Sequence, residues 1–313
     1  MNGVLVLLGP TAAGKSDLAV ALADWWAQRG QAVEIVSADS MSVYRGMDIG
    51  TAKPSLACRR RVPHHLIDLM EVTESASVAQ FQALARAAIA DCQARRALPI
   101  VVGGSALYLR AVIDRFDFPG SDPERRAALE AELAQIGPEA LHRRLVQLDP
   151  TAAAGIQPGN GRRLVRALEA IAVSGAFRSS LPQLDYALDG VVQIGLDLPR
   201  PELDRRIAQR VDQMWRDGLL EEVAGLLQRG LASGRTAARA IGYRQAIDQL
   251  AGRSSADQAR QETVQRTRRF ARRQLSWWRR DPRIEWLQGD PAPQPAAVAE
   301  LVAGRLGLPG PGV

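Results

Sequence analysis

Lysine is almost absent from this sequence. Its 313 residues include 40 lysines and arginines, of which only Lys15 and Lys53 are lysines. Arginine has therefore filled nearly every basic position where either residue would serve. Because a compact ammonium fits inside a ring of backbone amides and a planar guanidinium does not, we treat Lys15 as the first and Lys53 as the second candidate site residue.

Cysteines and long apolar segments are also scarce. The two cysteines, Cys58 and Cys92, have no metal-binding spacing, and a reducing compartment would not favour a disulfide between them. No apolar run approaches the ~18 residues of a membrane span, and the first residues carry no basic, cleavable leader. These absences indicate a cytoplasmic protein without a membrane partner.

The few histidines offer little for a metal site. His64 and His65 are adjacent and precede a short strand-like piece at 66–68, with no further ligands at a suitable spacing. We expect these histidines to make local hydrogen bonds or to support a nearby crevice rather than to take part in catalysis.

The sequence has an excess of positive charge, and part of this excess is concentrated in one segment. The net charge is +6 and the isoelectric point is near 10.0, which favours an anionic partner. Between Arg266 and Arg283 the sequence holds eight arginines and one acid, Asp281. We predict a helix that contacts the backbone of a nucleic acid; the alternative is a basic helix that faces only water.

The motif GPTAAGKS follows a short apolar strand, predicted at 4–8, and opens a helical segment, predicted at 17–28. Glycines at both ends of the motif permit a positive-φ path that turns backbone N–H groups inward, and the helix N-terminus adds partial positive charge. This is the setting of a P-loop, in which a serine reaches a phosphate-bound Mg²⁺. The predicted phosphate-binding residues are Gly9, Pro10, Thr11, Ala12, Ala13, Gly14, Lys15 and Ser16, with Ser16 as the Mg²⁺ ligand.

Two further predicted strands, at 32–36 and 98–102, end in polar loops. Asp39 follows the first of these strands, and Gly103, Gly104 and Ser105 follow the second. Because the carboxyl ends of parallel strands meet at one edge of a sheet, we expect Asp39 to lie near the phosphate; a turn or helix-capping aspartate is the alternative. The loop at 41–54 is long for a connection, which suggests a function.

The remaining pattern predicts an α/β fold with an insertion. From Phe116 to about Ser174 the sequence becomes helical, and a strand at 191–196 then resumes the sheet. We predict a parallel-sheet core with C-terminal helices at 1–118 and 188–313, and an inserted helical domain at 119–187.

The combined motifs resemble those of the bacterial tRNA dimethylallyltransferases, also called tRNA isopentenyltransferases. The matching segments follow the family order over most of the chain: GPTAAGKS at 9–16, SADSMSVYRGMDIGTAKP at 37–54, HHLID at 64–68, VVGGSALYLRA at 101–111, RRLVRALE at 162–169, AIGYRQ at 240–245 and RTRRFARRQLSWWR at 266–279. The sequence departs from the family at Pro158, which is followed by Gly159, Asn160 and Gly161 instead of Asn-Asp.

The resemblance implies a P-loop NTPase-like core, whose helical insertion contacts tRNA, and transfer of a dimethylallyl group from its diphosphate to N6 of the adenosine 3′ of the anticodon. Asp39 would be the general base, since the exocyclic amine of adenine is a weak nucleophile. Lys15 and Mg²⁺ would offset charge on the leaving diphosphate, and Arg206 or Arg210 would contact it.

The same resemblance implies a surface for the anticodon stem-loop of tRNA, with the target base flipped into a channel. We expect the protein to be a monomer. The implied tRNA-binding residues are Asp39, Ser40, Met41, Ser42, Ser105, Arg126, Arg162, Arg163, Leu164, Val165, Arg166, Arg239, Ala240, Ile241, Gly242, Tyr243 and Arg244. We expect Tyr243 to stack on a base.

Other functions remain open at this point. An adenylate isopentenyltransferase shares the P-loop and the base but acts on free nucleotide, which leaves the insertion and the basic helix unexplained. A P-loop phosphotransferase using ATP is a second alternative, because the loop itself does not distinguish ATP from an allylic diphosphate. A non-catalytic RNA-binding protein would explain the charge but neither Lys15 nor Asp39.

Overall fold

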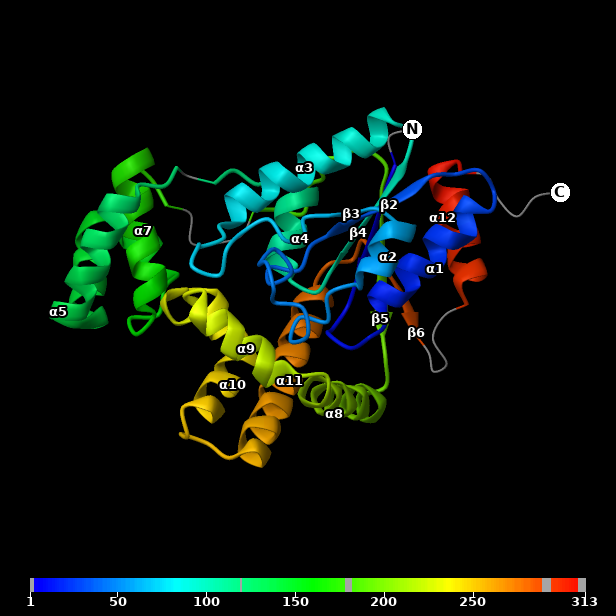
Figure 1. Ribbon diagram of the computed structural model, residues 1–313. Helices are drawn as coiled ribbons and strands as arrows, with labels where there is room; N and C mark the ends of the chain where they lie inside the picture. Colours follow the sequence, from blue (N-terminus) through cyan, green and yellow to red (C-terminus); the bar gives the residue numbers. More distant parts are fainter. Residues whose placement is uncertain (1–2, 119, 178–181, 289–293, 309–313) are drawn as a thin grey trace. The chain divides into compact units, whose positions relative to one another are not determined.

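The computed structural model describes residues 3–118, 120–177, 182–288 and 294–308, and the chain forms two compact units (Figure 1). The first unit comprises 1–114 and 186–313, and the second comprises 115–185. The boundaries predicted from sequence for the inserted domain were 119 and 187.

A six-stranded parallel sheet forms the centre of the first unit. Its strands lie in the order β3-β2-β4-β1-β5-β6. The central strand, β1, is buried on both sides, with Val4, Val6 and Leu8 in one apolar core and Leu5 and Leu7 in the other, which explains its uninterrupted apolar sequence. The strands are β1 (Val4–Leu8), β2 (Val33–Ser37), β3 (His64–His65), β4 (Leu98–Gly103), β5 (Val191–Asp197) and β6 (Ile284–Gln288).

Helices cover both faces of this sheet. On one face, α1 (Lys15–Ala27) and α12 (Pro295–Leu306) pack beside each other (Figure 1). The fully buried Trp26 of α1 belongs to the apolar core on this face. On the other face, α3 (Val78–Ala94) and α4 (Ala106–Ile113) supply Phe81, Ile89 and Leu109 among other core residues; a short helix, α2 (Leu56–Arg61), precedes β3.

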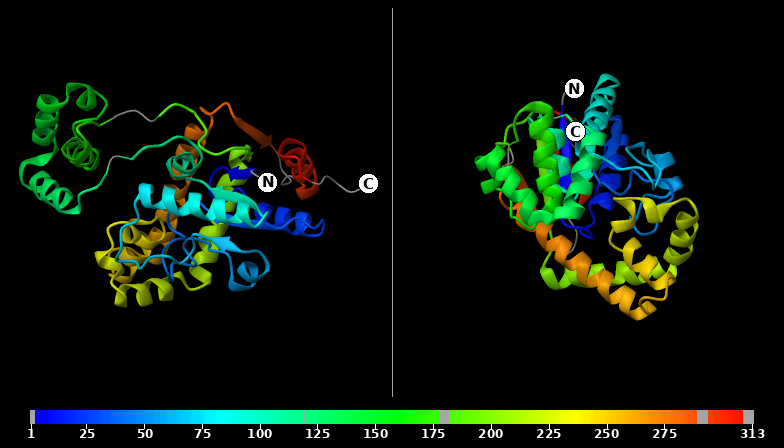
Figure 2. Two further views of the ribbon diagram at one scale, coloured as in Figure 1. Left: turned by 90° about the horizontal axis from the view of Figure 1, so that it is seen from above. Right: turned by 90° about the vertical axis from the view of Figure 1, so that its left-hand side faces the viewer.

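Four further helices pack against one another on the side of the first unit where the strands end (Figures 1 and 2). They are α8 (Arg200–Arg216), α9 (Leu219–Gln228), α10 (Tyr243–Leu250) and α11 (Ala256–Trp278), and two 3₁₀ turns at Leu231–Ser233 and Ala237–Arg239 connect α9 to α10. This group places α8 and α11 opposite the loops that leave β1, β2 and β4.

The predicted strands at 4–8, 32–36, 98–102 and 191–196 are present, each within one residue at either end. The strand-like piece predicted at 66–68 is wrong. The strand is His64–His65 instead, because Leu66 and Asp68 adopt φ values of 63° and 57°, which end the strand in a turn. The edge strand β6 was not predicted.

The second unit is helical, with a small core of its own. It consists of α5 (Pro123–Leu148), α6 (Pro150–Ala154) and α7 (Gly161–Ser174), packed around residues such as Leu129, Leu141 and Leu164. Asn160 caps α7 by accepting a hydrogen bond from the backbone N–H of Arg163. The unusual sequence at 158–161 therefore still supplies a helix cap.

Among the described residues, no helix combines the length and the apolar character needed to cross a membrane.

Candidate functional site

A cavity of about 460 Å³ opens in the first unit where β1, β2 and β4 end. It brings together the three loops that the sequence predicted at one edge of the sheet, and residues of α8 and α11 close the opposite side. Of the predicted site residues, those that line it are Thr11, Ala12, Gly14, Lys15, Ser16, Asp39, Ser40, Ser42, Ser105, Arg206 and Arg210.

Both glycines of the loop at 9–16 have positive φ values. Gly9 and Gly14 have φ values of 143° and 88°, and a Cβ atom at Gly9 would lie 2.7 Å from the carbonyl oxygen of Leu196. A side chain would therefore clash at Gly9, and both glycines allow a path that other residues rarely adopt. Because α1 begins at Lys15, the helix N-terminus adjoins the cavity and favours an anion there.

Lys15 is a partly buried cation at the base of the cavity. Its Nζ donates a hydrogen bond of 2.7 Å to the carbonyl oxygen of Pro10. Burial and the nearby charge of Arg210 lower the pKa of Lys15 to about 8, and the carboxylate of Asp39 opposes this effect only in part. The cavity therefore has an excess of positive charge that an anionic ligand would relieve.

Arg206 and Arg210, which the sequence left as alternative diphosphate contacts, have different surroundings. Arg210 reaches the P-loop, with Nη1 3.4 Å from Oγ1 of Thr11 and Nη2 donating to the carbonyl oxygen of Thr51 at 3.1 Å. Arg206 pairs with Glu202 at 2.6 Å. Arg210 forms no ion pair with any carboxylate among the described residues, and burial lowers its pKa. Both arginines line the cavity.

Asp39 makes a turn hydrogen bond and also lines the cavity. Its Oδ1 accepts a hydrogen bond of 2.8 Å from the backbone N–H of Met41, as a turn aspartate does. It also lines the cavity, close enough for its charge to act on Lys15 and Arg210. Met41 packs against the core and does not line the cavity.

Sequence reasoning missed Gln274, which lines the cavity from α11. Its Oε1 accepts a hydrogen bond of 2.9 Å from the backbone N–H of Thr11, 263 positions away. A Cβ atom at Gly104 would lie 2.3 Å from Nε2 of Gln274, so a side chain at this position would displace the amide from its place over the loop after β4. A single glutamine in an arginine-rich helix carries no local signal of this contact.

Lys53, the second candidate lysine, lies outside the cavity. Its side chain is fully buried, and its Nζ lies 2.8 Å from the carbonyl oxygen of Tyr44 and 2.6 Å from a carboxylate oxygen of both Asp48 and Asp68. Lys53 therefore holds the loop at 41–54 in shape rather than binding a ligand, and this corrects its assignment as a site residue. Thr51 and Ala52 of the same loop do line the cavity.

The side chains of the two adjacent histidines lie in different surroundings. His64 lines the cavity, and its Nδ1 lies 2.6 Å from the carbonyl oxygen of Val62. Because a carbonyl oxygen can only accept, Nδ1 carries a proton, and burial lowers the pKa of His64. His65 instead places Nε2 2.6 Å from Oε2 of Glu34, as expected for local hydrogen bonding.

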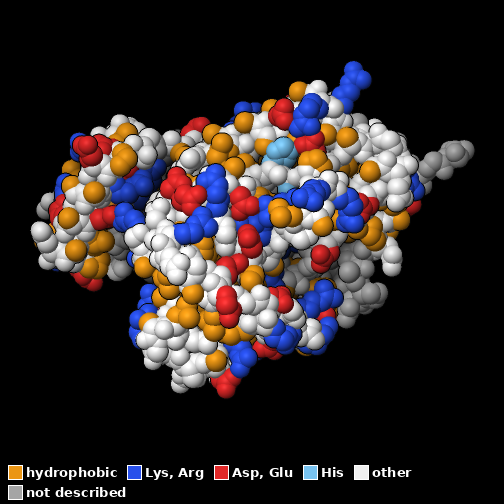
Figure 3. Space-filling model, in the orientation of Figure 1, with side chains coloured by type: hydrophobic (Ala, Val, Ile, Leu, Met, Phe, Trp, Pro, Cys, Tyr) orange, Lys and Arg blue, Asp and Glu red, His pale blue; other side chains and the backbone are white. Residues whose placement is uncertain are grey.

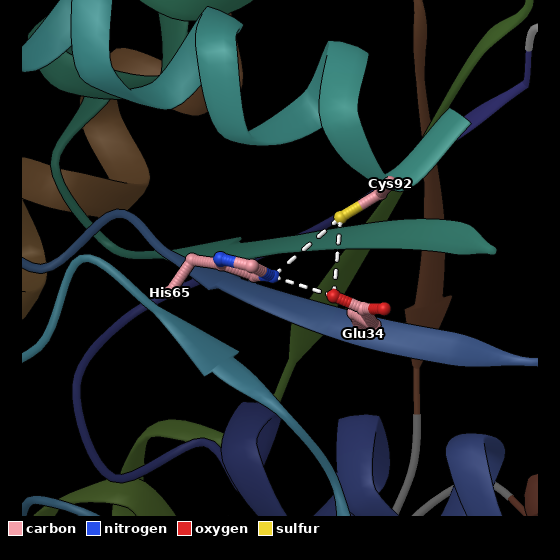
Figure 4. A group of neighbouring side chains, drawn as sticks. All are labelled: Glu34, His65 and Cys92. Carbon is pink, nitrogen blue, oxygen red and sulfur yellow. Dashed lines mark hydrogen bonds and ion pairs between the residues drawn. The ribbon is translucent and has the colours of Figure 1, made fainter. Parts of the chain in front are cut away.

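Glu34, His65 and Cys92 gather their ligand-type atoms within 4.8 Å of one another, although no metal spacing was visible in the sequence (Figure 4). Both oxygens of Glu34 are bound by Arg95, which lowers the pKa of Glu34 to about 2, and burial beside Glu34 raises the pKa of Cys92 to about 12. A cation would have to displace Arg95 and deprotonate the thiol. The cluster is a hydrogen-bonded network that joins β2, β3 and α3.

Two of the arginines that were predicted to contact RNA form ion pairs inside the second unit. Arg126 and Arg166 bond to the fully buried carboxylate of Glu169 at 2.9–3.0 Å. Arg162 and Arg163 are exposed. Leu164 and Val165 were also predicted to bind tRNA, and their side chains are packed in the core of this unit, so these side chains do not face a ligand.

The element at 239–244 is also divided between surface and core. Arg239 is exposed, and so is Arg244, which pairs with Asp248 at 2.9 Å. Tyr243 is fully buried, and its hydroxyl donates to Glu222 at 2.6 Å. The expectation that the Tyr243 ring stacks on a base is therefore corrected, because the ring is inside the protein.

The basic helix α11 and the segment after it carry paired and unpaired arginines. On the face shown in Figure 3, blue and red side chains are interspersed, in line with the many ion pairs of this protein. Arg266, Arg268, Arg279 and Arg283 all bind carboxylates. Those that pair with no carboxylate in the described part of the chain, and are exposed, are Arg269, Arg272, Arg273 and Arg280.

Comparisons with known proteins show the family of this chain. A profile described as IPP transferase matches residues 42–281. The tRNA dimethylallyltransferase of Thermobifida fusca (strain YX) is 56% identical over 291 residues, which cover 93% of this chain and 91% of that protein.

Two solved structures are also similar to this chain. The tRNA isopentenylpyrophosphate transferase of Bacillus halodurans has a TM-score of 0.71 and 38% identity, with 98% of this chain and 97% of that chain covered. A eukaryotic dimethylallyltransferase acting on tRNA has a TM-score of 0.81 at 24% identity, covering 99% of this chain and 81% of that one, and bears on the fold alone.

Proposed function

Because the chain belongs to the IPP transferase family, we propose that it is a tRNA dimethylallyltransferase that modifies N6 of the adenosine 3′ of the anticodon. The donor in this proposal is dimethylallyl diphosphate and the acceptor is the anticodon stem-loop of tRNA. The observation that carries it is one cavity that combines a P-loop lysine, a half-buried arginine without an acidic partner among the described residues, and the carboxylate of Asp39.

The cationic side of the cavity suits the diphosphate. Lys15, Arg210 and the N-terminus of α1 meet there, and each favours negative charge. As the bond between C1 of the dimethylallyl group and the bridging oxygen breaks, the electron pair leaves with the diphosphate. Charges that are already in place stabilise this leaving group without reorganisation.

The carboxylate side suits the acceptor. The lone pair of adenine N6 forms the new bond to C1, and the nitrogen then carries a surplus proton. Asp39 accepts that proton and later releases it to solvent, while its hydrogen bond to the backbone of Met41 keeps one oxygen oriented. Ser40, Ser42 and Ser105 line the same cavity and supply hydroxyl groups for the base.

Mg²⁺ is part of this proposal. The hydroxyl of Ser16 is an oxygen ligand of the kind that Mg²⁺ prefers, and it lines the cavity. Ser16 would hold the ion together with the phosphate oxygens of the donor, and the bound ion would neutralise charge on the diphosphate.

Contact with RNA is assigned to the exposed arginines. Arg269, Arg272 and Arg273 lie on α11, the helix that also supplies Gln274 and Phe270 to the cavity. Their position next to the site, and the lack of carboxylate partners among the described residues, favour contact with phosphates over a merely solvated helix. In the second unit, Arg162 and Arg163 are the exposed candidates.

One experiment distinguishes this function from its alternatives. The protein is incubated with dimethylallyl diphosphate, ATP, Mg²⁺ and either total tRNA or AMP. The nucleosides are then identified by mass spectrometry, and the remaining ATP is measured. We expect isopentenyladenosine in tRNA only, one per susceptible molecule and next to the anticodon. Modification of AMP alone would indicate an adenylate isopentenyltransferase, and consumption of ATP without prenylation would indicate a phosphotransferase.

A further inference from the structure

Glu222 of α9 joins two segments that are far apart in the sequence. Its Oε2 accepts hydrogen bonds from the backbone N–H groups of Asp48 and Ile49, at 3.0 and 2.7 Å. Its Oε1 accepts a hydrogen bond of 2.6 Å from the hydroxyl of Tyr243. One carboxylate therefore ties the loop at 41–54 to the start of α10.

The aromatic ring of Tyr243 completes this connection. A Cβ atom at Gly50 would lie 2.4 Å from Cε2 of Tyr243, so the loop passes the ring at a distance that only glycine permits. Burial and the charge of Glu222 raise the pKa of Tyr243, so its hydroxyl keeps its proton and remains a donor to the carboxylate.

The loop that Glu222 holds leads directly into the cavity. Thr51 follows Gly50 and lines the cavity, and its carbonyl oxygen accepts a hydrogen bond of 3.1 Å from Arg210. The other terminal nitrogen of Arg210 lies 3.4 Å from the hydroxyl of Thr11 in the P-loop. These are the contacts that orient a guanidinium with no acidic partner among the described residues.

We propose that Glu222 is a positioning residue for the donor: together with Tyr243 it fixes the loop at 48–51, and through the carbonyl of Thr51 it fixes the guanidinium of Arg210 in the anion site. This inference rests on the proposed function for the identity of the donor, but the anion site itself can be tested without turnover. Glu222 does not line the cavity, so it acts through Arg210 and not by contact with the substrate.

Removal of the Glu222 carboxylate should weaken the binding of pyrophosphate. In Glu222→Ala, two backbone N–H groups and the hydroxyl of Tyr243 lose their acceptor, and the loop at 48–51 is free to move. Since a displacement of about 1 Å at a binding group can change binding or rate by up to ~100-fold, we expect pyrophosphate to bind Glu222→Ala about tenfold or more weakly than wild type. The affinity for tRNA should stay within about threefold, because the α11 arginines are not attached to this loop.

A conservative variant separates positioning from charge. In Glu222→Gln, the amide oxygen can still accept from the backbone of residues 48 and 49, and the amide NH₂ can donate to the oxygen of Tyr243. We expect this variant to restore pyrophosphate affinity to within about threefold of wild type. Tyr243→Phe removes one hydrogen bond and should lie between Glu222→Gln and Glu222→Ala.

The decisive measurement is a double-mutant cycle on pyrophosphate affinity, determined by titration calorimetry of the full-length protein. If Glu222 acts through Arg210, the change Glu222→Ala should weaken binding much less in an Arg210→Gln background than in wild type. Asp114→Asn is the matched control, because Asp114 is a buried carboxylate of the same unit that binds Arg110 and Arg283 and does not line the cavity.

The positioning role of Glu222 and the proposed function can fail independently of each other. A wild-type protein that binds pyrophosphate but does not prenylate tRNA would contradict the function while leaving this test available. Unchanged pyrophosphate affinity in Glu222→Ala, a loss equal to that of Asp114→Asn at matched melting temperature, or full additivity with Arg210→Gln would each overturn the positioning role. If Glu222→Ala does not fold, Tyr243→Phe in the two Arg210 backgrounds decides the same question, because its effect on pyrophosphate affinity should likewise be smaller in Arg210→Gln than in wild type.

Discussion

The ammonium of Lys15 is hydrogen bonded to the carbonyl oxygen of Pro10, at 2.7 Å, within its own P-loop. A phosphate entering the cavity must compete for this donor, and it brings a full negative charge in place of a carbonyl dipole. Because burial and Arg210 already lower the pKa of Lys15 to about 8, the ligand and the proton are linked at this side chain.

This linkage predicts that donor binding takes up protons. Above pH 8 the side chain of Lys15 is largely the neutral amine in the free protein, whereas a bound diphosphate stabilises the charged ammonium. Up to one proton should therefore be absorbed per donor bound at pH 8.5. Calorimetric titrations in buffers of different ionisation enthalpy measure this number. Lys15→Gln should abolish the uptake, and an equal uptake in that variant would assign it to another group.

The same pKa predicts a pH-dependent stability. The folded pKa of about 8 lies below the ordinary value of 10.5, so the unfolded chain binds more protons between these pH values and stability rises across this window. Lys15→Met should therefore be more stable than wild type at pH 7, and its advantage should shrink as the pH approaches 10.5. Thermal melts at pH 7, 8.5 and 10 would test this, and an advantage that grows with pH would contradict it.

Asp39→Asn separates the two roles of Asp39. The amide oxygen can still accept the hydrogen bond from the backbone of Met41, but the amide cannot accept a proton. We expect turnover to fall by ~10²- to 10⁴-fold, the usual contribution of a general base, with little change in tRNA affinity. Single-turnover assays and filter binding measure the two quantities. Near-normal turnover in Asp39→Asn would show that another group takes the proton.

Arg210 and Arg206 should differ in their effect on the donor. Loss of a charged hydrogen bond to a ligand costs about 1.5–3 kcal/mol, so Arg210→Gln should raise the donor KM by ~10- to 100-fold. Arg206 is already paired with Glu202, and Arg206→Gln should raise it by less than about fivefold. Steady-state kinetics with saturating tRNA give both values, and the reverse order would exchange the two assignments.

The exposed arginines of α11 should determine the salt dependence of tRNA binding. Substituting Arg269, Arg272 and Arg273 by glutamine removes up to three phosphate contacts, each worth about 0.7–0.9 in the slope of log K against log salt. We therefore expect the slope to decrease by about 2–3. Arg266→Gln is the control, because Arg266 is paired with Glu262 and should leave the slope nearly unchanged.

The features that sequence predicted correctly are local ones. Val4–Leu8 is an uninterrupted apolar run that fits only a doubly covered strand, and the glycine spacing of the P-loop follows from the φ values that its turn requires. The prediction that three strand ends meet at one edge follows from parallel topology, and with it the place of Asp39 beside the P-loop.

The features that sequence missed depend on contacts between distant segments. The hydrogen bond from the backbone of Thr11 to Gln274 spans 263 positions, and the burial of Tyr243 follows from its contacts with Gly50 and Glu222. Lys53 was considered a site residue because lysines are rare, yet its fully buried side chain is enclosed by three oxygens from its own loop and from Asp68. Composition identifies unusual residues, but only packing shows what they touch.

The enclosure of Lys53 also makes this protein unusually simple to label. With two lysines in the sequence and one of them sealed, Lys15 is the lysine amine open to a reagent, and its lowered pKa makes it reactive near pH 8. An amine-selective dye or pyridoxal phosphate followed by reduction should therefore mark a single lysine, and a bound diphosphate should protect it. Occupancy of the anion site could then be read directly from the extent of lysine modification.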